Sequence, residues 1–251
     1  MIRKHIPNSI TLLNLLCGIL SIYTLYKTES LVLPSLFIII GALLDFCDGL
    51  SARLLKAYSN IGKELDSLAD VVTFGVAPSL IVVDLLQEFY RLNPIFSSYY
   101  FVVFIPLLMA LMSAYRLAKF NIDERQTSGF IGVPTPANAL IWISLPVIYY
   151  LESNSIHLWG FPLSGFHANL TAILLNPLVI LFGSILMSFL LVAELPLFAL
   201  KFKNLKWKEN KEKFIFLIIA IILIFAFNLY ATPIIIFVYI LESLIINIIK
   251  K

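Results

Sequence analysis

Long apolar runs, separated by short polar stretches, dominate the pattern of this 251-residue chain. A helix needs about 20 apolar residues to cross the hydrocarbon core of a bilayer. By that criterion the pattern predicts about eight membrane-spanning helices, at 8–26, 31–52, 67–86, 99–119, 136–151, 172–200, 213–230 and 232–249. The second run is apolar only as far as Leu44 and then becomes amphipathic, so we expect its last turns to protrude from the membrane. The sixth run is long, and its helix is expected to end near Pro196.

The composition agrees with this pattern. Hydrophobic residues make up 60% of the chain and charged residues 13%, whereas a soluble domain carries about 45–50% and about 25%. The sequence therefore predicts an all-α polytopic membrane protein whose helices pack as a bundle. We divide it into a membrane domain at 1–200, a basic cytoplasmic loop at 201–213 and a C-terminal transmembrane hairpin at 214–251. The net charge of +3 is too small to indicate a nucleic-acid partner.

The distribution of positive charge predicts the orientation in the membrane. With the N-terminus in the cytoplasm, all but two of the 18 Lys and Arg residues fall on the cytoplasmic side, and only Lys27 and Arg91 fall outside. Positive residues are enriched in cytoplasmic loops. We therefore expect both termini in the cytoplasm and a multi-pass protein of the cytoplasmic membrane. The lysine-rich stretch 201–213 is expected to be a topogenic loop that also attracts anionic headgroups.

Four aspartates follow the second apolar run at regular intervals. Asp45 and Asp48 are three residues apart, and Asp66 and Asp70 are four apart, so each pair lies on one face of a helix. Between the pairs, the segment 56–61 contains Tyr, Ser and Asn and is expected to form a turn. Two helices would then present two carboxylates each toward a common point at the cytoplasmic edge of the membrane.

These carboxylates predict a metal site. Carboxylates beside hydrocarbon are costly without a compensating partner, and oxygen-only ligands suit hard cations such as Mg²⁺ or Mn²⁺. Four of them can hold two ions, which clamp both oxygens of a phosphoryl displacement. Arg53 can add a bidentate contact to phosphate, and Gly49 and Gly62 remove side chains where a nucleotide or a partner helix comes close. Solvation of a helix end explains any single pair of aspartates equally well, and glycine is often a packing residue in membrane helices, but neither explains the whole set.

The same positions carry a family resemblance. The pattern Asp-x2-Asp-Gly-x2-Ala-Arg-x8-Gly-x3-Asp-x3-Asp resembles the signature of the CDP-alcohol phosphatidyltransferases, and it is matched throughout, by Asp45, Asp48, Gly49, Ala52, Arg53, Gly62, Asp66 and Asp70. The resemblance implies that the first three aspartates are metal ligands and that Asp70 is the general base, with a further role at the metal site. It also implies the reaction, in which a hydroxyl attacks the β-phosphorus of a CDP-linked lipid or alcohol and CMP is released.

A second motif concerns the nucleotide. The stretch Pro7-Asn8-Ser9-Ile10-Thr11 resembles the family's short motif that enters the first helix near the nucleotide. The resemblance implies a binding site for CDP and its phosphates that consists of Asn8, Thr11, Gly49, Ala52, Arg53 and Gly62. Homodimerisation is expected from the resemblance alone.

Three further stretches resemble the phosphatidylserine synthase branch of this family, at 67–78, 115–121 and 130–137. In the second stretch, Lys119 stands where the branch has arginine, and the planar guanidinium is lost. Serine brings an ammonium group and a carboxylate, so we expect Arg116, Lys119 and Asn121 to contact the acceptor or the lipid phosphates. The predicted reaction makes phosphatidylserine and CMP from CDP-diacylglycerol and L-serine.

Other interpretations stay open from the sequence. The nearest is the same chemistry with another acceptor: glycerol 3-phosphate, inositol or an inositol phosphate. An intramembrane prenyltransferase also uses aspartate–metal clusters, but the spacing of Gly62, Asp66 and Asp70 disfavours it. A cation transporter would place carboxylates near mid-bilayer and would show an inverted repeat, whereas these aspartates cluster at one edge and no repeat is visible. The expected partners are CDP-diacylglycerol, L-serine and membrane lipids.

Overall fold

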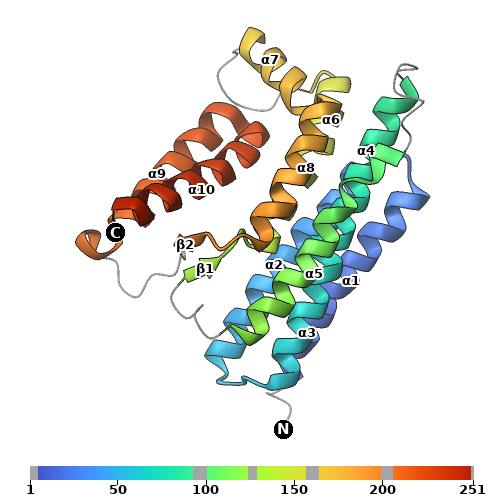
Figure 1. Cartoon of the computed structure of the whole chain (residues 1–251). Coiled ribbons are helices and arrows are strands. Elements are labelled where there is room, and N and C mark those ends of the chain that lie inside the picture. The colour runs from blue at the N-terminus through green and yellow to red at the C-terminus, as the bar shows by residue number, and fades with distance from the viewer. Residues whose placement is uncertain (1–4, 93–100, 124–128, 157–163, 199–205, 250–251) are drawn as a thin grey trace.

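The structure is a computed structural model that describes residues 5–92, 101–123, 129–156, 164–198 and 206–249. Nearly all of these residues are helical, and the long helices of the first half of the chain run alongside one another as a bundle (Figure 1). In chain order the elements are α1 (His5–Lys27), α2 (Val32–Leu54), α3 (Asn60–Asp70), the π-helix η2 (Val71–Val76), α4 (Ala77–Leu92), α5 (Leu107–Ile122), β1 (Gly129–Ile131), α6 (Thr135–Ser153), α7 (Ser164–Leu174), α8 (Pro177–Val192), β2 (Pro196–Phe198), α9 (Trp207–Phe227), the 3₁₀ helix η4 (Asn228–Tyr230) and α10 (Ala231–Ile249).

Five segments of the described residues are long and apolar enough to cross a membrane. They are His5–Lys27, Val32–Leu54, Asn60–Arg91, Phe101–Ile122 and Asn210–Ile249, and the last contains both helices of the C-terminal hairpin. Large apolar side chains such as Leu43 and Phe225 are exposed on the outside of these helices, where lipid would cover them. The chain is therefore a multi-pass helical membrane protein. The number of eight spans and the cytoplasmic position of the termini stay predictions.

The N-terminal half of the bundle is packed through small residues. Thr73, in the π-helix that follows α3, lies against both α1 and α2. A Cβ atom added at Gly18 would lie 2.6 Å from Thr73 Oγ1, and one added at Gly41 would lie 2.6 Å from Thr73 Cγ2. Glycine at these two positions therefore allows the close helix approach that is typical of membrane bundles. The adjacent Phe74 is also fully buried, so neighbouring side chains of the π-helix pack inside the protein.

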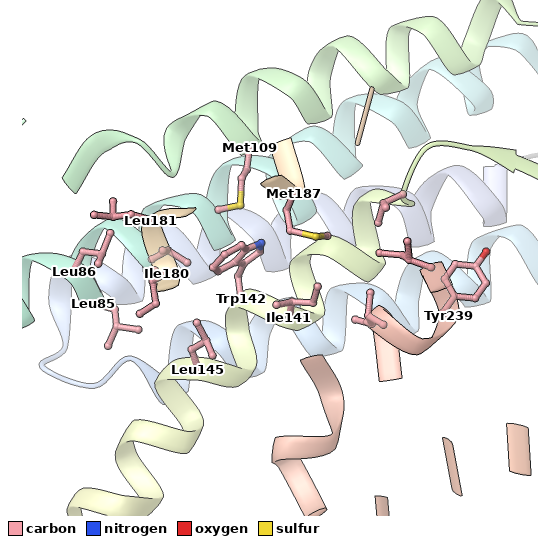
Figure 2. Close-up of a cluster of buried hydrophobic side chains, with 14 of the residues drawn as sticks. Leu85, Leu86, Met109, Ile141, Trp142, Leu145, Ile180, Leu181, Met187 and Tyr239 are labelled. Atoms are coloured by element: carbon pink, nitrogen blue, oxygen red, sulfur yellow. The ribbon is translucent and has the colours of Figure 1, made fainter. Parts of the chain in front are cut away.

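A second core joins the later helices to the bundle. Figure 2 shows buried side chains from α4, α5, α6, α8 and α10 that meet around Trp142. Helix α6 lies at the centre of this core, because Ile141, Trp142 and Leu145 on it are all nearly inaccessible. The Trp142 indole N–H donates to Asn138 Oδ1 at 2.9 Å on the same helix, so its polar group is satisfied inside the core.

The prediction of one long sixth helix over 172–200 is wrong. Helix α7 ends at Leu174, and α8 begins at Pro177 and ends at Val192, shortly before Pro196 as expected. The side chain of Asn176 accepts from the backbone N–H of Leu178 at 2.9 Å, and Pro177 occupies the first helical turn. Asparagine as an N-cap followed by proline is a strong helix-start signal inside an apolar run.

The sequence predicts an all-α fold, and this prediction is wrong in one detail, because the structure also contains two short strands. Strands β1 and β2 pair antiparallel, with Gly129 opposite Phe198 and Ile131 opposite Pro196. Each strand has only three residues, which gives too little alternation for a pattern to reveal. Beyond this pair, α9 begins at Trp207, so the second half of the predicted basic loop 201–213 is helical. Residues 201–205 of that loop lie outside the described residues.

Candidate functional site

A tight turn between α2 and α3 brings the four aspartates together. Helix α2 ends at Leu54, and Lys56 takes a left-handed conformation with φ of 50°. The Ala57 N–H then donates to Ala52 O at 2.9 Å, which closes the end of the helix. Ser59 caps α3 by accepting from the Gly62 N–H at 3.0 Å. The expected turn at 56–61 is therefore present, and it is fixed at both ends.

Three of the four carboxylates form one group. Oxygen atoms of Asp45, Asp48 and Asp66 all lie within 4.8 Å of one another. Asp48 is buried and the other two are half-buried. Negative groups this close and this poorly solvated repel one another, so a cation between them would stabilise the arrangement. An all-oxygen donor set fits Mg²⁺ or Mn²⁺, and Asp45, Asp48 and Asp66 are the residues that would hold the ion.

Helix α1 supports this group from the side. The Thr11 hydroxyl donates to Asp48 Oδ2 at 2.6 Å, and both residues are buried. A hydrogen bond to one carboxylate oxygen restricts the rotation of the carboxylate and leaves the second oxygen available for a cation. Thr11 therefore acts on the predicted metal site through Asp48, in addition to lining the cavity described below.

Asp70 lies one helical turn beyond Asp66 and is not part of the group of three. Its carboxylate is buried and accepts from the side-chain amide of Asn14, with 3.3 Å between Asn14 Nδ2 and Asp70 Oδ1. Asn14 is itself held, because the Thr73 hydroxyl donates to its backbone carbonyl at 3.0 Å. The structure thus separates three clustered carboxylates from a fourth that has its own amide partner.

A cavity of about 450 Å³ opens beside these carboxylates. Every predicted site residue except Lys119 and Asn121 lines it, namely Asn8, Thr11, Asp45, Asp48, Gly49, Ala52, Arg53, Gly62, Asp66, Asp70 and Arg116. A second cavity of about 750 Å³ lies among residues such as Glu29, Asp84 and Tyr149, and none of the predicted site residues lines it. The smaller cavity is therefore the candidate active site.

The two glycines of the motif have different surroundings. A Cβ atom at Gly62 would lie 2.9 Å from Ser59 Oγ and 3.0 Å from Asn8 Oδ1, so glycine permits α1 to approach the start of α3. A Cβ atom at Gly49 would meet only Arg53 Nη2, at 3.7 Å. Gly49 therefore leaves space toward the cavity, whereas Gly62 is required by the packing of protein groups.

Two cations line the cavity at different depths. Arg53 is exposed and its Nε donates to Gly49 O at 2.9 Å, which orients the guanidinium along α2. Arg116 is only 6% exposed, and its Nε has no hydrogen-bond partner among the described residues. Its guanidinium carbon lies 5.9 Å from the centre of the Phe120 ring. Among the described residues no carboxylate forms an ion pair with Arg116 at contact distance, although Asp70 is within electrostatic range of it. A buried guanidinium of this kind is suited to an anionic ligand.

Lys119 and Asn121 lie outside the cavity lining and contact other parts of the protein. Lys119 forms an ion pair with Glu194 at 3.1 Å. Asn121 Oδ1 accepts from the Ser67 hydroxyl at 3.2 Å, and its backbone carbonyl accepts from Lys63 Nζ at 2.6 Å. These contacts fix the end of α5 to α3 and to the segment after α8, and a direct contact of either residue with the acceptor stays a prediction.

The sequence interpretation overlooked two residues of this site. Asn14 is fully buried, and the available signal was an amide inside an apolar run, three residues after Thr11. Thr135 is also fully buried, lines the cavity at the first turn of α6, and its hydroxyl has no partner among the described residues. It stands in the stretch 130–137, but neither its spacing nor its neighbours indicated a contact with the site.

Comparison with known proteins agrees with this geometry. Residues 4–181 match the family model described as CDP-alcohol phosphatidyltransferase. The chain belongs to the CDP-alcohol phosphatidyltransferase family. The matched residues contain the whole lining of the candidate active site. As a member of this family, the chain is a membrane enzyme of the phosphatidyltransferase class.

Several relatives within the CDP-alcohol phosphatidyltransferase family bear one name, CDP-diacylglycerol–serine O-phosphatidyltransferase. The chain is 40% identical to the one from Bacillus subtilis over 152 residues, which cover 58% of this chain and 77% of that protein. It is 31% identical to one from Helicobacter pylori over 242 residues, covering 95% of this chain and 89% of that protein. The one from Methanocaldococcus jannaschii is 38% identical over 144 residues, covering 57% of this chain and 61% of that protein.

Proposed function

We propose that this enzyme transfers the phosphatidyl group of CDP-diacylglycerol to the hydroxyl of L-serine and releases CMP. The observation that carries the proposal is the buried Arg116 in the same cavity as the aspartates. Among the described residues no carboxylate forms a contact ion pair with this guanidinium, although Asp70 is within electrostatic range, and the carboxylate of serine would supply a direct partner. The names of the relatives from Bacillus subtilis and Helicobacter pylori support the same choice of donor and acceptor.

The roles of the residues follow from where they line the cavity. Arg53, at the exposed rim, is proposed to bind the diphosphate, together with the backbone near Gly49 and the side chains of Asn8 and Thr11. The ions held by Asp45, Asp48 and Asp66, with Asp70 as a further ligand if two ions bind, would neutralise the phosphate charge and stabilise the departing CMP. Arg116 is proposed to hold the serine carboxylate, with the Thr135 hydroxyl and the N-terminus of α6 beside it.

Asp70 is proposed to act as the general base. Its carboxylate accepts the proton of the serine hydroxyl as the oxygen forms a bond to the β-phosphorus, and the bond from that phosphorus to the CMP oxygen breaks. Proton transfer by a positioned group contributes about 10²–10⁴-fold to rate. The Asn14 amide, at 3.3 Å from Asp70 Oδ1, is proposed to hold the carboxylate in one orientation, so that its other oxygen can accept the proton.

Sidedness and assembly belong to the same proposal. The positive-inside distribution supports an active site and termini on the cytoplasmic side, where soluble serine and CDP-lipid headgroups meet. The resemblance to the family supports a homodimer. Labelling of introduced cysteines near Arg53 with a membrane-impermeant reagent, in intact cells and in inverted vesicles, tests the sidedness.

One assay tests the acceptor. Purified protein is incubated with CDP-diacylglycerol, Mn²⁺ or Mg²⁺ and one alcohol at a time, and the release of CMP is measured. We expect CMP release with L-serine and not with glycerol 3-phosphate, inositol or inositol phosphate. Release with one of these other alcohols alone would refute serine as the acceptor but leave the phosphatidyl transfer intact. Ion transport without CMP release would refute the enzyme and support the transporter.

A further inference from the structure

The C-terminal hairpin contacts the segments that lead into the active site. Its helices, α9 and α10, lie beyond residue 181, where the family match ends. Nevertheless α10 packs against β2 and against α6, and in Figure 2 its Tyr239 lies at the edge of the buried cluster around Trp142. The hairpin is therefore in contact with the two elements that flank the entry to the cavity, β2 and α6.

Helix α10 holds strand β2 at both ends. The Tyr239 hydroxyl donates to the backbone carbonyl of Phe198 at 2.6 Å. The side-chain amide of Asn247, two turns further along α10, donates to the backbone carbonyl of Pro196. The Tyr239 ring also packs edge-on against the Phe198 ring, with 5.0 Å between centroids. Strand β2 is an edge strand of a two-stranded sheet, and α10 satisfies carbonyl groups that this edge leaves unpaired.

Strand β2 in turn fixes the segment that enters the site. It pairs with β1, and the Gly132 N–H that follows β1 donates to Leu195 O at 2.9 Å. The next residue, Val133, donates its N–H to Leu190 O at 3.0 Å. Pro134, Thr135 and Pro136 come directly afterwards and line the cavity. A continuous series of hydrogen bonds therefore connects Tyr239 to the cavity wall that contains Thr135.

Tyr239 also lies near the other group of that wall. Its hydroxyl is within electrostatic range of the Arg116 guanidinium, and both side chains are buried. Arg116 on α5 and Thr135 on α6 belong to different helices, so neither fixes the position of the other. Tyr239 is within electrostatic range of Arg116 and is connected to Thr135 through β2 and β1.

We propose that Tyr239 is a positioning residue for the acceptor side of the active site, acting through its hydrogen bond to Phe198 O and the paired strands. The C-terminal hairpin then serves to hold the loop before α6 in place against Arg116. This inference rests on the proposed function in one respect: the proposed function assigns the cavity wall with Arg116 and Thr135 to the acceptor. The ordering of the strands by Tyr239 does not depend on which acceptor is used.

The test uses two tyrosines of the same hairpin. Tyr239→Phe removes the hydroxyl that binds β2, whereas Tyr230→Phe removes a buried hydroxyl that binds Glu152 and Thr171 instead. Amide exchange in peptides that cover 129–135 and 190–198 is measured on the full-length purified protein by mass spectrometry. We expect Tyr239→Phe to accelerate exchange at Gly132 and Val133 by about fivefold, the factor that corresponds to one hydrogen bond. Tyr230→Phe should leave these amides at the wild-type rate.

Kinetics supply the second measurement. Tyr239→Phe is expected to raise KM for serine by about fivefold while kcat and KM for CDP-diacylglycerol stay within twofold of wild type. A variant that is merely less stable would lose active enzyme and so lower kcat without changing KM. Unchanged exchange, or an unchanged acceptor KM, in Tyr239→Phe would overturn the inference. If the wild-type protein uses another acceptor, the proposed function fails, and the same comparison with that acceptor still tests Tyr239.

Discussion

Asn14 on α1 donates its side-chain amide to Asp70 Oδ1 on α3 across 3.3 Å, and the two residues are 56 positions apart in the chain. Asn14 is fully buried and Asp70 nearly so. A buried carboxylate with a single amide partner is restricted to one orientation, because rotation would leave both groups unsatisfied. The contact therefore gives the proposed base a fixed direction relative to the group formed by Asp45, Asp48 and Asp66.

Asn14→Leu should lower kcat by about tenfold, since it removes one hydrogen bond to the charged proposed base, worth ~1.5 kcal/mol. KM for CDP-diacylglycerol should change little. The matched control is Ser21→Ala on the same helix, where the Ser21 hydroxyl donates to Pro34 O at 2.9 Å in an equally buried position. That control should affect stability but not kcat. Equal kcat in Asn14→Leu and wild type would show that the amide does not orient Asp70.

Asp70→Asn should lower turnover by about 10²–10⁴-fold, the contribution of a positioned general base. Because Asp70 lies outside the group of three carboxylates, binding of CDP-diacylglycerol in the presence of Mn²⁺ should be partly retained. Single-turnover CMP release and equilibrium binding of the lipid separate the two effects. Turnover at the wild-type level would exclude the role of base.

Asp45→Asn should weaken Mn²⁺ binding by at least about tenfold, because one of three clustered carboxylates loses its charge. Electron paramagnetic resonance of free Mn²⁺ titrated with purified protein measures the affinity directly and needs no substrate. Asp84→Asn is the control, since Asp84 is a carboxylate on α4 that lines the other cavity. Mn²⁺ affinity that is the same in Asp45→Asn as in wild type would argue against Asp45 as a ligand.

Thr11→Val should also weaken Mn²⁺ binding, although Thr11 acts only through Asp48. The substitution keeps the shape of the side chain but removes the donor to Asp48 Oδ2, and the loss of such supporting hydrogen bonds typically costs about 10–100-fold in metal affinity. Thr24→Val on the same helix is the control, because among the described residues the Thr24 hydroxyl bonds only carbonyl groups of α1. If both variants bind Mn²⁺ like wild type, Thr11 does not support the site.

Two glycine substitutions should separate packing from binding. Gly18→Ala introduces a methyl group 2.6 Å from Thr73 Oγ1 and should lower the stability by about 1–3 kcal/mol, as overpacking does. Gly49→Ala meets only Arg53 Nη2, at 3.7 Å, and should leave the unfolding temperature unchanged. It should instead raise KM for CDP-diacylglycerol, because the methyl group points into space that the nucleotide is proposed to use. Thermal unfolding in detergent and substrate titration check the pair, and a reversed result would contradict the packing described for both glycines.

The sequence by itself determined the membrane class and the aspartates that are predicted to hold metal. Apolar runs of sufficient length reveal membrane helices without any knowledge of their neighbours, and the intervals between Asp45, Asp48 and Asp66 place their side chains on helix faces because helical periodicity is local. The turn between the two helices was also predictable, since Ser59 and Asn60 are typical of a helix start. The choice of family followed from these same positions.

Only the tertiary structure decided which other residues reach the site. Asn14, Thr135 and Tyr239 come from three distant helices, and their relation to the aspartates depends on how those helices pack, which no local pattern records. For the same reason the structure directs Lys119 toward Glu194 and away from the cavity lining, although it stands beside Arg116 in the same motif. The short strands β1 and β2 are held by pairing across at least 65 residues and by α10, so a local sequence pattern does not reveal them, and yet they fix the segment that lines the cavity.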